Sequence, residues 1–433
     1  MVKNSMRYEL ASNFCDGVID GTHDSPKAVS EGKPLVTSKH IKGRRSVNLS
    51  ESYLISEEDY NQINKRSQVH QWDVIISMIG EYCGFCYIER EKIIEYAIKN
   101  VGAFKTRSKE KAEWLYYYLN SPTGKAHLTK SKGGSTQPYL ALGKLRELPI
   151  LLPKEVEDIP KLTRALSSLD QKIELNNKIN EELEKTAKLI YDYWFVQFDF
   201  PISKEQAITM GDPSLEGKPY KSRGGTMVYN KKLKRDIPEG WSDTTVKDFE
   251  PNIVTGKTPS TKDPSNFGND VPFVCIGDVR GNLHVVSTEL SLSDKGANLQ
   301  KNKYLPAGSI CVTCIATVGL VAFVAFESQT NQQLNSIVCG DEQNKEYLFF
   351  SLKNFFKFSV GAKTGNTFAN MNKGDFGDIK ILAPCPYLVK SYHDTVAPMF
   401  AKALNNSMES KELKGLRDWL LPMLMNGQVS VSE

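Results

Sequence analysis

The sequence predicts an α+β protein with two repeated, mostly β domains separated by two long antiparallel helices that form a coiled coil, arranged about a pseudo-twofold axis. Three observations support this fold class: the length of 433 residues, an internal repeat, and a heptad pattern at the end of each repeat. A chain of this length exceeds one ordinary hydrophobic core, so two or more domains are expected. The predicted order is a first domain over 1–153, a first helix over 154–198, a linker over 199–240, a second domain over 241–386, and a second helix with the C-terminal tail over 387–433.

The internal repeat consists of five segments that recur in the same order and at a nearly constant spacing. The pairs are Pro34–Gly43 with Pro272–Gly281, Asp73–Gly80 with Ser309–Ala316, Trp114–Leu119 with Tyr347–Leu352, Lys132–Thr136 with Lys363–Thr367, and Ile150–Pro153 with Ile381–Pro384. Short runs rich in Val, Ile, Phe and Tyr lie between turn signals in both halves. Such runs are typical of strands, so each half is predicted to have a mostly β core.

Each half ends in a long amphipathic helix whose apolar positions alternate by four and three residues, as in a coiled coil. The first seam is Leu162, Leu166, Leu169, Ile173, Asn176, Asn180, Leu183, Ala187, Ile190 and Trp194. The second is Val396, Met399, Ala403, Asn406, Ser410, Leu413, Arg417, Leu420 and Leu424, and Ser410 and Arg417 interrupt it. Asn176 and Asn406 occupy the same register, which favours pairing of the two helices over packing of each helix on its own domain. The pairing residues are expected to include Leu169, Ile173, Asn176, Leu183, Ile190, Met399, Asn406, Leu413 and Leu420.

Several features exclude other classes of protein. The uncharged stretch between Lys303 and Glu327 is long enough for a membrane helix, but its Pro, Gly and β-branched residues indicate two buried strands joined by a turn. The opening residues show no signal-peptide pattern, and cysteines expected to be reduced fit a cytoplasmic protein. Two Cys-x-x-Cys pairs, Cys83/Cys86 and Cys311/Cys314, fall at non-equivalent places in the repeat, so buried structural thiols are favoured over a metal site.

Catalytic motifs are missing from the sequence. The chain has no Pro-Pro dipeptide, and therefore no adenine-methyltransferase loop of the Asn/Asp-Pro-Pro type. Gly256-Lys257-Thr258 imitates the end of a phosphate-binding loop, but Pro251 stands where that loop needs Gly. Asp170-Gln171-Lys172 resembles half of a nuclease motif but lies on the predicted helix, and the six histidines lack metal-ligand spacing. No catalytic residue, no metal and no cofactor bound by this chain are therefore expected.

Basic and polar residues gather at related places in both halves. The net charge of +4 is compatible with nucleic-acid binding without establishing it. Lys and Arg can neutralise phosphates, and polar side chains on a Gly-rich loop can approach base edges. For any single residue the alternative is an ordinary solvated surface. The candidate DNA-binding residues are Lys39, His40, Lys42, Arg44, Arg45, Lys132, Ser135, Thr136, Gln137, Tyr139, Arg280, Lys363, Asn366, Thr367, Asn370 and Asn372.

Several motifs resemble the specificity (S) subunit of type I restriction–modification systems over nearly the whole chain. They are Asp20-Gly21-Thr22-His23 followed by Pro26, Ile237–Trp241 leading to Thr255–Pro259, Leu169–Asn176, Tyr193–Phe195, Gly217–Lys221 and Gly224-Gly225. The first half departs from this pattern, because Arg7-Tyr8-Glu9-Leu10 stands where an opening with Trp is expected.

The resemblance implies two target-recognition domains that each read one half of a split, asymmetric site on double-stranded DNA. It also implies that the paired helices set the half-site spacing and dock two methyltransferase (M) subunits, which bind S-adenosylmethionine. Restriction (R) subunits would add ATP- and Mg-dependent cleavage. A coiled-coil scaffold with two protein-binding domains is the alternative, supported by the low net charge, and a fused nuclease or methyltransferase is the third interpretation.

Overall fold

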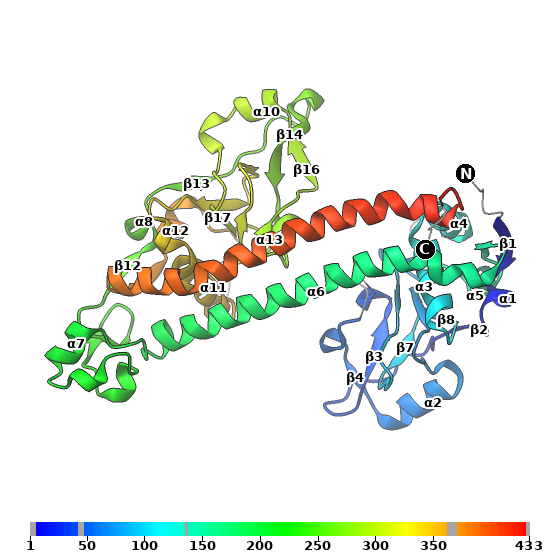
Figure 1. Ribbon diagram of the computed structural model, residues 1–433, viewed down its shortest axis with the longest axis horizontal. Helices are drawn as coiled ribbons and strands as arrows, with labels where there is room; N and C mark the ends of the chain where they lie inside the picture. The colour runs from blue at the N-terminus through cyan, green and yellow to red at the C-terminus, as the bar shows by residue number, and fades with distance from the viewer. Residues whose placement is uncertain (1–5, 42–46, 135–136, 362–369, 430–433) are drawn as a thin grey trace. The chain divides into compact units, whose positions relative to one another are not determined.

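The computed structural model describes residues 6–41, 47–134, 137–361 and 370–429 of the chain. It divides into two compact units. Unit 1 comprises Met1–Lys172 and Leu413–Glu433, and unit 2 comprises Ile173–Glu412. Both long helices, α6 and α13 in Figure 1, therefore contribute a segment to each unit.

Unit 1 is built on an antiparallel four-stranded sheet in the order β2-β8-β5-β6. A three-stranded sheet in the order β4-β3-β7 contains one parallel pair, β3 with β7, and β1 pairs with β9. The strands are β1 (Met6–Leu10), β2 (Gly17–Asp20), β3 (Lys33–Thr37), β4 (Leu54–Ile55), β5 (Val74–Ser77), β6 (Cys86–Ile88), β7 (Ala97–Lys99), β8 (Val101–Lys105) and β9 (Pro149–Pro153). The helices are α1 (Ala11–Phe14), α2 (Glu57–Ser67), α3 (Lys109–Asn120), α4 (Pro122–Ser131) and α5 (Leu142–Arg146), with a 3-10 turn η1 (Ser38–His40).

Unit 2 repeats this arrangement with one additional strand. Its main sheet has the order β13-β20-β17-β18-β15, its second sheet the order β16-β14-β19, and β12 pairs with β21. The strands are β12 (Ser242–Thr245), β13 (Ile253–Thr255), β14 (Phe267–Val274), β15 (His284–Val285), β16 (Leu290–Leu292), β17 (Ile310–Thr313), β18 (Val321–Val324), β19 (Gln329–Thr330), β20 (Leu334–Ile337) and β21 (Lys380–Ala383). The helices are α8 (Val246–Phe249), α9 (Ile276–Val279), α10 (Asp294–Asn298), α11 (Lys345–Gly361) and α12 (Lys373–Gly377).

The predicted repeat is confirmed at the level of strand pairing. The single parallel pair of the second sheet recurs, β3 with β7 in unit 1 and β14 with β19 in unit 2. The uncharged stretch between Lys303 and Glu327 contains β17 and β18, two buried strands as predicted, and they pair antiparallel. No helix in the described ranges is long and apolar enough to cross a membrane.

The two long helices are α6 (Ile159–Tyr191), continued by a π-helical turn over Asp192–Val196, and α13 (Pro386–Met425). In both units their segments run antiparallel, because residues further along α6 contact residues earlier on α13. All the predicted seam residues are buried or half-buried. In unit 1, Leu162 and Leu166 share a core cluster with Leu424.

Polar contacts set the alignment of α6 with α13 in unit 2. The Asn176 Nδ2 atom donates to the carbonyl oxygen of Asn406 (3.3 Å) and to Ser410 Oγ (3.3 Å). Asn406 Nδ2 donates to Asn180 Oδ1 over 2.9 Å. The predicted pairing of Asn176 with Asn406 is therefore confirmed, and Ser410, which interrupts the apolar seam, is a partner of this buried amide.

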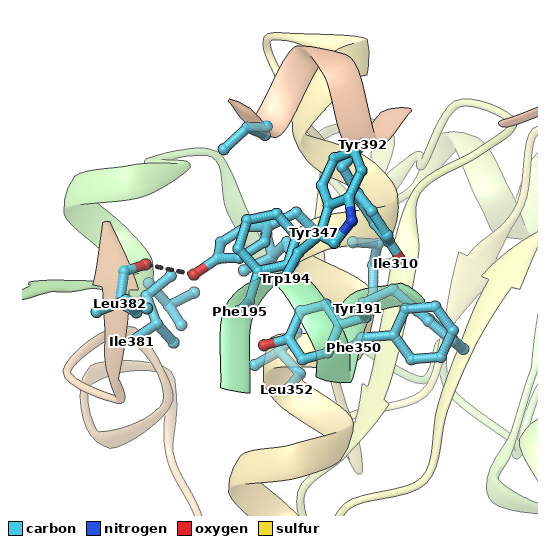
Figure 2. Packing of buried hydrophobic residues seen from close by; sticks show 14 of the residues in the cluster. Tyr191, Trp194, Phe195, Ile310, Tyr347, Phe350, Leu352, Ile381, Leu382 and Tyr392 are labelled. Carbon is cyan, nitrogen blue, oxygen red and sulfur yellow. Dashed lines mark hydrogen bonds between the residues drawn. The ribbon is translucent and has the colours of Figure 1, made fainter. Parts of the chain in front are cut away.

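Aromatic side chains at the end of α6 form the centre of the unit 2 core (Figure 2). Tyr191 and Phe195 pack on Tyr347 of α11, whose hydroxyl donates to the Leu382 carbonyl oxygen over 2.5 Å. The 199–240 segment, predicted to be a linker, is folded: it contains α7 (Lys204–Thr209) and the hairpin β10 (Met227–Asn230)–β11 (Arg235–Pro238). Tyr220 from this segment stacks on Phe200, at a centroid distance of 4.6 Å, so the segment extends the core.

The interruption of the seam at Arg417 provides a test of the helix pairing in unit 1. Asp170 is buried and accepts hydrogen bonds from Arg417 Nη1 (2.9 Å) and the Tyr117 hydroxyl (2.8 Å). Arg417→Met would remove the cation that compensates this carboxylate, and we expect the free energy of unfolding to fall by about 3 kcal/mol. Calorimetry or urea denaturation measures the change.

The double variant Arg417→Met/Asp170→Asn should regain most of that loss, because the uncompensated charge is gone. Lys414→Met, at an exposed position of α13, is the matched control and should change stability little. Equal destabilisation in the single and double variants would contradict a role for the ion pair.

Candidate nucleic-acid interface

Three strands of the main sheet of unit 1 have their ends at one edge. β2 ends and β8 begins there, because Asp20 pairs with Gly102. β5 ends there as well, because Ser77 pairs with Val101. The turns that follow β2 and precede β8 therefore lie side by side, and this sheet edge positions the residues described next.

The turn after β2 passes very close to the neighbouring strand. A Cβ atom on Gly21 would lie 2.2 Å from the Ile98 carbonyl oxygen, so no larger residue fits. The exposed ring of His23 follows, with Nδ1 3.0 Å from Asn100 Oδ1 and Nε2 3.1 Å from Asp20 Oδ2. These contacts fix the orientation of a polar, solvent-accessible ring at the edge.

The Gly-rich loop that contains Gly133 and Gly134 also reaches this edge, although it lies later in the sequence. Leu140 N donates to the Met78 carbonyl oxygen (2.8 Å), just beyond the end of β5. Gly133 and Tyr139 exchange backbone hydrogen bonds of 2.9 and 3.0 Å, which close the loop. A Cβ atom on Gly133 would lie 2.7 Å from the Tyr139 ring, so the glycine makes room for this ring, which is 48% exposed.

The 3-10 turn η1 is joined to the same edge, since Ser38 Oγ donates to the Asn100 carbonyl oxygen over 2.7 Å. Lys39 is exposed. His40 is only 5% exposed, and its Nδ1 accepts from Thr37 N over 2.8 Å. The prediction that His40 lies on a DNA-binding surface is therefore wrong, because this ring caps the turn inside the domain.

Unit 2 builds the same edge from equivalent strands. Thr255 pairs with Asn335 and Thr313 with Leu334, so β13 and β17 end where β20 begins. A Cβ atom on Gly256 would lie 2.0 Å from the Asn331 carbonyl oxygen, as at Gly21 in unit 1.

The side chains at this second edge are also polar. The Thr258 hydroxyl donates to Gln332 Oε1 over 2.5 Å, in the place of the His23–Asn100 contact. Asn370 forms a bridge with Ile315, and Met371 N donates to the Cys314 carbonyl oxygen over 2.9 Å. Arg280 Nη2 donates to Thr317 Oγ1 over 3.2 Å.

We call these two sets of residues the polar edges. The polar edge of unit 1 comprises Thr22, His23, Lys39, Asn100, Gln137 and Tyr139, and that of unit 2 comprises Lys257, Thr258, Arg280, Thr317, Gln332 and Asn370. Five of the predicted DNA-binding residues belong to these polar edges: Lys39, Gln137 and Tyr139 in unit 1, and Arg280 and Asn370 in unit 2. Lys132 is half-buried beside Gly84, and Asn372 is exposed but uses its Oδ1 to cap α12. Lys42, Arg44, Arg45, Ser135, Thr136, Lys363, Asn366 and Thr367 lie outside the described residues.

Seven residues of the polar edges were missed as contact candidates: Thr22, His23, Asn100, Lys257, Thr258, Thr317 and Gln332. His23 and Thr258 follow glycines at matching places after β2 and β13, which a comparison of the two halves could have revealed. Asn100 and Gln332 are brought to them by strand pairing, which leaves no local signal in the sequence.

The cysteine pairs are parts of the two cores. Cys83 and Cys86 are buried in unit 1, and Cys311 and Cys314 are buried in unit 2. Burial raises the pKa of the Cys86 and Cys311 thiols to about 12, so both stay protonated at neutral pH. Among the residues that the structure describes, no three His, Cys, Asp or Glu side chains are grouped to hold a metal ion.

Comparison with known proteins reveals similarity over most of the chain. Residues 26–185 and 238–387 match the family model of the type I restriction modification DNA specificity domain. The type I restriction enzyme HindI specificity subunit of Haemophilus influenzae is 35% identical over 356 residues, which cover 73% of this chain and 77% of that protein. The MjaIX specificity subunit of Methanocaldococcus jannaschii is 27% identical over 330 residues, covering 74% and 70%. The crystal structure of the type I restriction-modification S subunit from M. genitalium has a similar fold, with a TM-score of 0.55 at 12% identity over 98% of this chain and 97% of that chain.

The close backbone approach at each polar edge can be tested with alanine. Gly256→Ala places a methyl group against a fixed carbonyl oxygen, and we expect a loss of about 1–3 kcal/mol in the free energy of unfolding. Gly277→Ala in α9 is the control, because nothing lies within 4 Å of its added Cβ. Thermal denaturation of both variants measures the difference, and an unchanged Tm for Gly256→Ala would contradict the packing described.

Proposed function

Because the chain belongs to the type I restriction–modification DNA specificity family, we propose that it reads a split, asymmetric DNA site, one half-site with each polar edge. The observation that carries the proposal is the recurrence of the edge. Both units present exposed polar side chains at the same sheet edge, after a glycine that leaves no space for a side chain.

The two edges differ in the side chains that they present, which is the basis for reading two different half-sites. Unit 1 offers His23 and Gln137, whereas unit 2 offers Lys257 and Arg280. Amide side chains pair with adenine and Arg with guanine in the major groove, and Lys contacts phosphates. The two edges share a backbone arrangement but present different side chains, so they would read different bases. The DNA site would therefore be asymmetric.

The second part of the proposal concerns partner subunits. Leu175 and Leu189 on α6, and Tyr193 in the π-helical turn that follows it, are 52%, 68% and 40% exposed. Leu175 and Leu189 share one face of the helix, about 100° from the seam. A groove of about 300 Å³ continues this face and is lined by Lys178, Ile179, Glu182, Leu183 and Thr186. An exposed apolar stripe on a charged helix is typical of a protein interface.

We assign this α6 stripe to two M subunits, which would supply S-adenosylmethionine and the methyl transfer. R subunits, with ATP and Mg²⁺, would complete the assembly. In this proposal the chain contributes sequence recognition and assembly, and no cofactor of its own.

DNA binding separates this function from that of a protein-binding scaffold. The chain with its M subunits should bind a duplex carrying its site, and the affinity should fall as salt rises, because phosphate contacts release counterions. Equal affinity for the site and for random duplex would contradict sequence recognition.

Exchange of one domain tests whether each polar edge reads one half-site. Replacing residues 1–153 by the corresponding domain of another S subunit should change one half-site and leave the other unchanged, because each edge lies within one unit. Mapping methylated adenines in cells that express the chimera measures both half-sites. A change in both would contradict one edge per half-site.

A charge on the α6 stripe tests the docking of M subunits. Leu189→Glu should weaken association with M subunits at least tenfold, because it places a carboxylate in an apolar contact. Asn177→Glu, at an exposed position on another face of α6, is the matched control and should associate normally. Co-purification and analytical ultracentrifugation measure the assembly, and circular dichroism checks that both variants fold.

A further inference from the structure

The turn that joins β5 to β6 places aromatic side chains at the polar edge of unit 1. Phe85 lies opposite the last residue of β5, since Ser77 N donates to the Phe85 carbonyl oxygen over 2.8 Å. Its side chain is 43% exposed. The half-buried ring of Tyr82 supports it, at a centroid distance of 5.8 Å. An exposed phenyl group is thus held at the edge by its own turn.

Tyr139 brings a third ring to the same edge, because it forms a bridge with Ile79 at the start of this turn. The Lys132 ammonium group lies next to the turn as well, with Nζ 3.5 Å from the position of a Cβ on Gly84. The surface therefore combines apolar rings with a cation that suits the phosphate backbone. Exposed rings that lie close together are a common feature of interaction surfaces.

The corresponding turn of unit 2 has a different composition. Ile315–Leu320 has the sequence Ile-Ala-Thr-Val-Gly-Leu, without an aromatic residue. Asn370 forms the bridge with Ile315 that Tyr139 forms with Ile79. The aromatic turn therefore distinguishes the polar edge of unit 1 from that of unit 2.

We infer that Phe85, supported by Tyr82, contacts the 5-methyl group of a thymine in the half-site read by unit 1. In the major groove, the thymine methyl is the apolar group that a base edge presents, so an exposed ring at a reading edge has one matching target. The inference rests on the proposed function. It adds Phe85 as a specificity-determining residue and the thymine methyl as its ligand.

The experiment removes the methyl group from the DNA. The chain is assembled with its M subunits, and its site is found by mapping methylated adenines. Thymines are then replaced by deoxyuridine in one half-site at a time. Binding should weaken about fourfold for one position in the half-site of unit 1, the contribution of one buried methyl group.

Protein variants test the same contact by removing the Phe85 ring. Phe85→Ala should bind the thymine and uracil duplexes equally, because the partner of the methyl group is gone. Ile93→Ala is the control. This side chain is 82% exposed and follows β6, at the opposite end of the strands from the polar edge. The variant should keep the fourfold difference between the two duplexes.

Three outcomes would overturn the inference. One is a uracil duplex that binds the parent complex as well as the thymine duplex at every position of the half-site. Another is a Phe85→Ala complex that retains the fourfold difference. A third is weaker binding by Phe85→Ala without any effect of uracil, which would indicate a ring inserted between base pairs. In all three, site-specific binding by the parent complex would leave the proposed function standing, whereas its absence would overturn both.

Discussion

The buried amide contacts between α6 and α13 are the constraint on which the alignment of the two long helices depends. Apolar seams with heptad spacing can slide by a full repeat at small cost, whereas a buried amide must meet a partner. Asn180 Oδ1 accepts from Asn406 Nδ2, and Asn180 Nδ2 donates to the Ala403 carbonyl oxygen over 3.1 Å. A slip by one heptad would leave these groups buried and unpaired, so one register is selected.

The polar edges follow from a second constraint, which lies in the backbone. Gly21 and Gly256 allow the chain after β2 and β13 to pass against the adjacent strand, where a Cβ would meet a carbonyl oxygen. Backbone hydrogen bonds hold the same turn in both units: Gly21 N donates to the Val101 carbonyl oxygen, and Gly256 N to that of Leu334. Each polar edge is thus held by backbone groups, which do not depend on residue type, together with one glycine.

The sequence predicts the parts of this fold that depend on local periodicity. The seam, the repeat and the pairing of Asn176 with Asn406 come from spacing alone. What could not be predicted depends on contacts between distant segments, as at Asn100. His40 is instructive: the repeat aligns it with Asp278, whose Oδ2 accepts from Cys275 N as His40 Nδ1 accepts from Thr37 N. His40 was predicted to bind DNA because its segment is basic. Its counterpart in unit 2, Asp278, is an acidic residue that accepts a hydrogen bond from the backbone of its own turn.

The separation of backbone from side chain explains how one architecture can recognise different sequences. Because backbone bonds and glycines hold each edge, a change such as His23 to Thr258 alters the exposed chemistry without disturbing the turn. The same holds for the loop, where Tyr139 and Asn370 occupy equivalent bridges. The two copies within this chain therefore differ where side chains meet solvent and are alike where strands meet, which is the pattern expected if the two polar edges read different half-sites, as proposed.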